Sequence, residues 1–100
     1  MILEVAVLMV KPDLTSEFEE AFHKAETLLP LNKGYNSHEL MRCIECPSQY
    51  ILQVSWETIQ DHELGFRQSE HYKIWSSLLH HFYDPFPEVY HYDGLEEYNE

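Results

Sequence analysis

The order in which hydrophobic spacing changes along the chain constrains its fold more than any other feature. Residues 2–10 read Ile-Leu-Glu-Val-Ala-Val-Leu-Met-Val, a short apolar run rich in β-branched side chains. Such a run is typical of a strand with both faces buried. Residues 14–29 then place apolar side chains three and four positions apart with charged residues between them, which predicts an amphipathic helix. We expect Thr15 or Ser16 to cap this helix, and Ser16 with Glu19 has the spacing of a capping box.

Two further strands are predicted to form a hairpin in the middle of the chain. Pro30 and the turn at residues 32–34 end the first helix, and the next strand candidate covers residues 35–45. Residues 50–56 then alternate, so that Tyr50, Leu52, Val54 and Trp56 share one face. The turn between these two strands is short, which favours antiparallel pairing.

The last third of the chain completes the pattern. A helical region is predicted from about residue 59 to residue 82, with Thr58 as its cap and a break at Ser69. A short strand follows at residues 89–92, which gives the order β-α-β-β-α-β. Two right-handed crossovers on one sheet make this a ferredoxin-like α+β fold, with helices on one face of a four-stranded antiparallel sheet.

Helices cover only one face of such a sheet, yet the strand at residues 2–10 is apolar on both. The uncovered face therefore needs a partner, most simply a second copy of the same sheet. We predict a homodimer in which two sheets pack face to face.

Composition limits the partners and the domain count. The 100 residues fit one domain, residues 1–100, which ends in an acidic tail at residues 93–100. Six basic and 18 acidic residues give a net charge of −12, so neither nucleic acid nor an anionic membrane is an expected partner. No apolar run approaches the roughly 20 residues that cross a bilayer, and the first residues do not resemble a secretory signal. We therefore expect a cytoplasmic protein.

A series of short motifs runs from the first helix to the second helical region. They are Phe18-Glu19-Glu20-Ala21-Phe22, Gly34-Tyr35-x-Ser37-His38-Glu39-Leu40, Pro47-Ser48-Gln49-Tyr50, Trp56-Glu57-Thr58 with Asp61-His62, Phe66-Arg67-x-Ser69 and Tyr72-x-x-Trp75. In this order they resemble the antibiotic biosynthesis monooxygenase (ABM) family of small dimeric α+β barrels. The resemblance covers nearly the whole chain.

The resemblance implies an oxygenase that uses no metal or other cofactor, because family members that oxidise anthrones or quinols let the electron-rich substrate react with oxygen. Haem-degrading relatives carry an Asn on the first strand, a Trp in the second helical region and a His one helix further. Here the first strand has no Asn, and the other two positions fall near Gly65 or Phe66 and near Trp75. Haem degradation is therefore set aside. A non-enzymatic ligand-binding dimer and an isomerase-like relative stay open as alternatives, since fold alone does not choose the reaction.

His62 is the predicted catalytic residue. It shares a helix face with Phe66 at a spacing of four, and a neutral imidazole in an apolar pocket can take a proton from a phenol or quinol. The alternative is a buried structural histidine bonded to a backbone carbonyl.

The predicted substrate-binding residues are mostly aromatic, although stripes of this kind are also usual in cores: Trp56, Phe66, Tyr72 and Trp75. Of the oxygenase relatives' pocket residues, only a Trp transfers to this chain, as Trp56. Arg42 is predicted to hold an anionic group of the substrate, and its alternative is an ion pair with a carboxylate. The negative net charge favours a neutral phenolic or quinol-like substrate over an anion.

Metal and redox sites are not expected. The Cys43-x-x-Cys46 pair has no second pair to complete a zinc site, and no helix begins after it. His80 and His81 are adjacent, so they point to different sides of a helix. His91, between two tyrosines, is expected at the pocket mouth or in the dimer interface.

Overall fold

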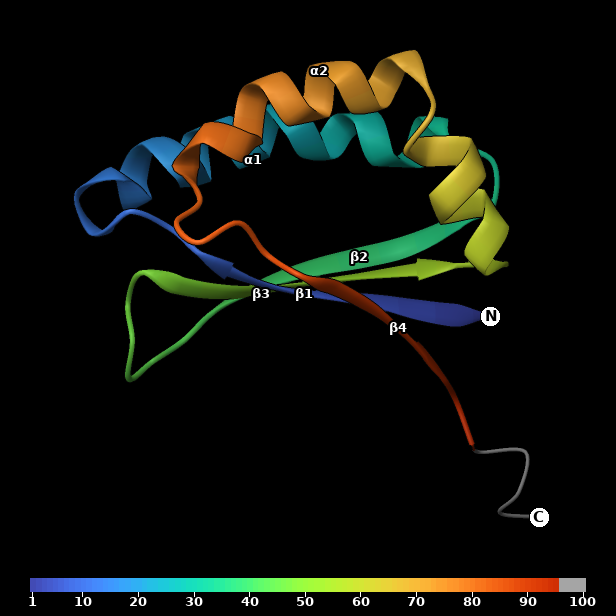
Figure 1. Cartoon of the computed structure of the whole chain (residues 1–100), viewed down its shortest axis with the longest axis horizontal. Coiled ribbons are helices and arrows are strands. Elements are labelled where there is room, and N and C mark those ends of the chain that lie inside the picture. The colour runs from blue at the N-terminus through green and yellow to red at the C-terminus, as the bar shows by residue number, and fades with distance from the viewer. Residues whose placement is uncertain (96–100) are drawn as a thin grey trace.

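The computed structural model describes residues 1–95 and confirms the ferredoxin-like α+β fold. Its main elements follow in the predicted order: β1 (Ile2–Met9), α1 (Thr15–Ala25), β2 (Tyr35–Arg42), β3 (Gln49–Trp56), α2 (Glu70–Leu79) and β4 (Val89–Asp93). The sheet has the order β2-β3-β1-β4, and every neighbouring pair is antiparallel. Both long helices lie on one face of the sheet (Figure 1).

The core lies between that face and the helices. Strand residues alternate in burial, so that Tyr50, Leu52, Val54 and Trp56 of β3 are all buried. In the neighbouring β1, Leu8 and Ala6 are opposite Tyr50 and Leu52 and point to the same side. The helices add mainly Phe18, Phe22, Trp75 and Leu79.

The predicted capping box at Ser16 and Glu19 is wrong. A 3-10 turn over Pro12–Leu14 precedes the helix, so Leu14 occupies the N-cap position and no side chain caps α1. Ser16 lies inside the helix, where its hydroxyl cannot serve the first turn.

Pro30 also does not end the helix as predicted. The chain continues from α1 into a 3-10 segment, Glu26–Leu31, that contains Pro30. The Asn32 side-chain amide then donates to the carbonyls of Leu28 and Leu29 and closes the segment.

The strand ends differ from the prediction by a few residues. β2 stops at Arg42 rather than residue 45, because the chain then turns back, and the Gln49 N–H bonds the Cys46 carbonyl within that turn. β4 runs one residue further than predicted, to Asp93. Most of the predicted acidic tail, residues 96–100, lies outside the described residues.

The second helical region is divided at Ser69, as predicted. Its first part is a short π-helical turn, η3 (Asp61–Phe66), and the Thr58 hydroxyl accepts the Asp61 N–H at 3.1 Å. Ser69 then caps α2 by accepting the Tyr72 N–H at 3.1 Å.

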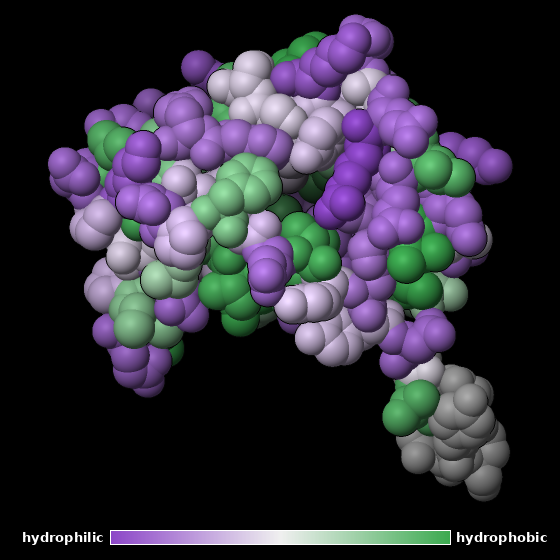
Figure 2. All heavy atoms as spheres, viewed as in Figure 1, coloured by the Kyte–Doolittle hydropathy of each residue, from purple (hydrophilic) through white to green (hydrophobic). Residues whose placement is uncertain are grey.

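The sheet face opposite the helices carries many apolar side chains. Tyr90 and Tyr92 of β4 are 57% and 55% exposed there, and Val7 of β1 is 42% exposed. Figure 2 shows mainly hydrophilic residues over the helical layer and hydrophobic ones gathered lower on the same view. Among the described residues, no helix combines the length and hydrophobicity required to span a membrane.

Candidate functional site

A cavity of about 310 Å³ lies between the sheet and the second helical region. Its walls are largely apolar and aromatic: Leu8, Leu52, Phe66, Tyr72, Trp75 and Phe86. Four acidic or basic side chains also line it, and they are Glu4, His62, Arg67 and His80. A concave, largely apolar space with a few polar groups is typical of a small-molecule site.

The structure brings together the predicted catalytic residue and three of the five predicted substrate-binding residues. His62, Phe66, Tyr72 and Trp75 all line this cavity. Trp56 does not line it, because its side chain is fully buried one layer behind. Its indole ring stacks on the His62 imidazole, with ring centroids 5.6 Å apart and 25° between the planes. Trp56 therefore supports the wall rather than forming it.

Glu4 is the residue that sequence reasoning missed. It points to the helix side of β1, together with Ala6 and Leu8, and is 7% exposed. Its Oε1 accepts the Trp56 indole N–H at 2.9 Å and lies 3.4 Å from Nε2 of His62. A charged residue within an otherwise apolar strand was the available signal, since the alternation of β1 places it inward.

His91 joins this group from the neighbouring strand. It is opposite Glu4 in the β1–β4 register, and its Nε2 lies 2.8 Å from Nδ1 of His62. One nitrogen of this pair donates and the other accepts. When His62 Nδ1 donates, its Nε2 is left as an acceptor facing Glu4. His91 is half-buried, so the group extends from the cavity wall toward solvent.

Burial determines the protonation states of Glu4 and His62. Desolvation raises the pKa of the Glu4 carboxyl to about 7, although the Trp56 hydrogen bond and the Arg67 charge oppose the shift. Desolvation, followed by the charges of Arg67 and His91, lowers the pKa of His62 to about 3. The 3.4 Å approach would suit an ion pair, but burial favours the uncharged form of both groups. At neutral pH His62 is therefore uncharged, and Glu4 exchanges between its acid and its carboxylate.

Local sequence fixes where His62 lies. Gly34 has φ of 84°, and the Asp61 side chain occupies the space that a Cβ on Gly34 would need. Because Gly34 has no side chain, the start of η3 can pack closely against the turn before β2. The Arg67 N–H bonds the His62 carbonyl at 3.0 Å and closes the π-helical turn.

Comparison with known proteins agrees with this architecture. The family model described as antibiotic biosynthesis monooxygenase, ABM, matches residues 1–77. The chain belongs to the ABM family. It is 47% identical over 95 residues to YczJ, an uncharacterized protein of Bacillus subtilis (strain 168). The match covers 95% of this chain and 100% of YczJ.

Solved structures of ABM proteins share the fold. A Bordetella bronchiseptica protein named for the same family has a TM-score of 0.89 and 33% identity, covering 94% of this chain and 96% of that one. SnoaB from Streptomyces nogalater, named as a cofactor-independent oxygenase, has a TM-score of 0.79 at 16% identity, covering 93% and 91%. The second likeness concerns the fold alone.

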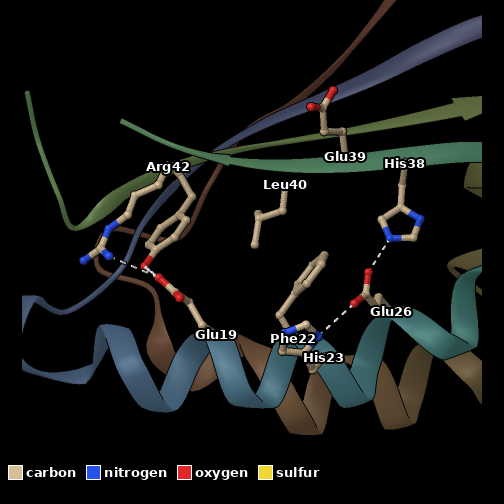
Figure 3. Close-up of a pocket in the computed structure, with 9 residues that line it drawn as sticks. Glu19, Phe22, His23, Glu26, His38, Glu39, Leu40 and Arg42 are labelled. Atoms are coloured by element: carbon tan, nitrogen blue, oxygen red, sulfur yellow. Dashed lines mark hydrogen bonds and ion pairs between the residues drawn. The ribbon is translucent and has the colours of Figure 1, made fainter. Parts of the chain in front are cut away.

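Arg42 of this ABM protein lies in a different cavity, also of about 310 Å³, between α1 and β2. Its guanidinium is 3.4 Å from the Glu19 carboxylate, which also accepts the Tyr50 hydroxyl (Figure 3). At the other end, Glu26 bonds His38 at 2.7 Å and His23 at 3.2 Å. The structure therefore does not bring Arg42 together with the other predicted site residues.

The polar groups of this second cavity pair with one another across α1 and β2, whereas Glu4 and His62 face a largely apolar space. We take the cavity at Glu4 and His62 as the candidate site. Within residues 1–95, no three His, Cys, Asp or Glu side chains are grouped to hold a metal ion.

Proposed function

We propose that the protein is a monooxygenase that needs no cofactor and oxidises a small aromatic, phenolic or quinol-like molecule in the cavity beside Glu4 and His62. Membership of the ABM family supports a monooxygenase-type role. The observation that carries the substrate class is the cavity itself, in which aromatic walls surround a buried acid and a neutral imidazole. Its volume of about 310 Å³ is at the lower end for small-molecule sites, which suits a compact ring system.

The chemistry requires only the substrate and oxygen. A phenolic substrate that has lost a proton supplies electrons to O2, and oxygen then adds at an activated ring carbon. For an anthrone, loss of water converts the ring CH2 group and O2 into a carbonyl group and H2O. For a hydroquinone, the ring C–H carbon that takes up oxygen keeps one oxygen atom, so that hydroquinone and O2 give a hydroxyquinone and H2O. The protein holds the ring, excludes water and handles the proton, and His62 is the sequence-predicted residue for that last role.

The working unit proposed here is a homodimer formed through the open sheet face. The apolar side chains of Val7, Tyr90 and Tyr92 on that face support this arrangement. The candidate cavity lies on the opposite side of the sheet, so each copy would keep its own site. We also propose a cytoplasmic location, which is supported by the free thiols of Cys43 and Cys46.

Oxygen consumption with a panel of hydroquinones and anthrones tests the proposed function. The protein should consume oxygen with at least one neutral member of the panel in metal-free buffer, with the oxidised product formed in equal amount. Tight binding measured by calorimetry without oxygen consumption across the panel would instead favour a non-enzymatic ligand-binding dimer. Isomerised product without oxygen consumption would favour the isomerase-like alternative.

A further inference from the structure

Glu4 is the one acidic side chain that lines the candidate cavity. Its Oε1 accepts the Trp56 N–H at 2.9 Å, so the carboxylate is oriented with this oxygen toward Trp56. Its Oε2 makes no hydrogen bond within residues 1–95 and is not among their fully enclosed unpartnered atoms. One carboxyl oxygen is thus fixed by the protein, and the other is available to a molecule in the cavity.

His62 is poorly suited to take a proton from that molecule. Its pKa of about 3 makes the imidazole a weak base, because protonation would place a charge in a buried position near Arg67. Glu4, with a pKa of about 7, is a much stronger base at neutral pH. A base works best when its pKa lies near the working pH, so Glu4 is better suited than His62 to take the proton from the ligand.

The arrangement of His62 and His91 provides an exit for the proton. His62 Nε2 faces Glu4 Oε1 at 3.4 Å, and His62 Nδ1 lies 2.8 Å from Nε2 of the half-buried His91. Two imidazoles in series can pass a proton while each stays neutral before and after the transfer.

We propose that Glu4 takes the proton from the hydroxyl group of a phenolic ligand, and that His62 and His91 carry it between Glu4 and solvent. The O–H bond of the ligand breaks, and its electron pair stays on the phenolate oxygen while Glu4 becomes a neutral acid. Rotation of the neutral Glu4 carboxyl group then brings the protonated oxygen to His62 Nε2. As His62 Nε2 takes this proton, His62 Nδ1–H passes to His91 Nε2, and His91 releases its Nδ1 proton to solvent. The proposal deepens the proposed function and rests on it only for the later reaction with oxygen.

The charges around Glu4 agree with this role. Three side chains from neighbouring elements lie beside Glu4: Trp56 from β3, His62 from η3 and His91 from β4. The charge of Arg67 also acts on Glu4, and the charge of Glu63 acts on His91. Arg67 is the cation that acts on both Glu4 and His62. It favours a phenolate in the cavity once Glu4 has become neutral.

A nitrophenol, whose ionised form has its own visible absorption band, tests the contact without any oxygen chemistry. Its affinity for wild type, Glu4→Gln and the exposed control Glu20→Gln is measured from pH 5.5 to pH 8.5. The Gln side chain keeps an oxygen that can accept the Trp56 indole N–H, but it cannot ionise. At pH 8.5 Glu4→Gln should bind the phenolate at least about tenfold more tightly than wild type, which corresponds to about 1.4 kcal/mol of like-charge repulsion. At pH 5.5 the two affinities should agree, and Glu20→Gln should follow wild type throughout.

The oxidation of hydroquinone supplies a second readout. Glu4→Gln should lower kcat about 100-fold and remove the rise in rate near pH 7. Glu4→Asp should restore part of the rate together with that rise. His91→Gln should slow turnover but keep the rise, because His91 acts after Glu4.

The two measurements separate the claims. If wild type consumes no oxygen but the affinity difference at pH 8.5 is found, the proposed function fails and the role of Glu4 in taking the ligand proton stands. Equal nitrophenol affinities at every pH, absence of nitrophenol binding, or full turnover by Glu4→Gln would overturn the assignment of Glu4.

Discussion

At the scale of single residues, Glu4 and His62 give the free energy of unfolding two opposite dependences on pH. The pKa of Glu4 is raised from 4.5 to about 7 in the folded protein, so its contribution is fully present below pH 4.5 and is lost as the pH rises to about 7. The pKa of His62 is lowered from 6.5 to about 3, so its contribution is present above pH 6.5 and is lost as the pH falls to about 3. Near neutral pH, ionisation of the buried Glu4 carboxyl therefore lowers the free energy of unfolding.

Replacing Glu4 with Gln should remove the first of these dependences. The variant should be more stable than wild type at pH 8, by about 1–3 kcal/mol, and the gain should shrink toward zero by pH 4.5. Urea unfolding at several pH values measures the difference, with Glu20→Gln as the control for loss of one negative charge. A constant difference across the pH range would contradict the raised pKa of Glu4.

Sequence reasoning placed some site residues correctly and missed others. His62 and Phe66 were predicted to face the interior because a spacing of four fixes a common helix face, and both are buried. Glu4 was overlooked, although alternation with Ala6 and Leu8 sends it inward. Arg42 does point to the helix side, but β2 is the edge strand, and strand order cannot be derived from alternation within one strand.

At the scale of elements, the contact between Gly34 and Asp61 links the turn before β2 to the π-helical turn that carries His62. The positive φ of Gly34 excludes a side chain for conformational reasons, and Asp61 excludes it by occupying the space. The strand and helix order was predictable because hydrophobic spacing determines it. The helix ends were not, because the 3-10 segments at both ends of α1 depend on tertiary contacts.

Gly34→Ala should destabilise the protein by at least about 1–3 kcal/mol, because the alanine must adopt a strained backbone conformation and displace Asp61. Nitrophenol binding should weaken with it, since η3 would shift. Gly65→Ala is the matched control: the nearest atom to its added Cβ is 4.0 Å away, and alanine is the better helix former. Equal melting temperatures for the two variants would contradict the role assigned to Gly34.

At the scale of the whole molecule, the net charge of −12 and the apolar sheet face have opposite effects on the association of two copies. The charge keeps copies apart and disfavours anionic ligands, while the open face favours association. The sequence predicts the second copy because β1 is apolar on both faces, and the dimer stays a prediction.

Val7→Glu should shift the protein from dimer to monomer, because it places a charge in the centre of the proposed interface. Sedimentation in an analytical ultracentrifuge measures the change, and Leu64→Glu, an exposed position on η3, is the control. Wild type that sediments as a monomer at micromolar concentration would contradict the dimer.

The central claim is that the cavity beside Glu4 and His62 is where a small phenolic molecule is bound and oxidised. Ala6 lines this cavity, and Leu40 lines the other one. Ala6→Phe should therefore fill the first space at a cost in stability of about 1–3 kcal/mol, and Leu40→Phe should perturb the second space only. The most direct measurement is oxygen consumption with the best hydroquinone of the panel, after circular dichroism has established that both variants are folded. We predict that Ala6→Phe loses at least nine-tenths of the wild-type rate and that Leu40→Phe keeps most of it. The reverse pattern, or equal rates in both variants, would contradict the account.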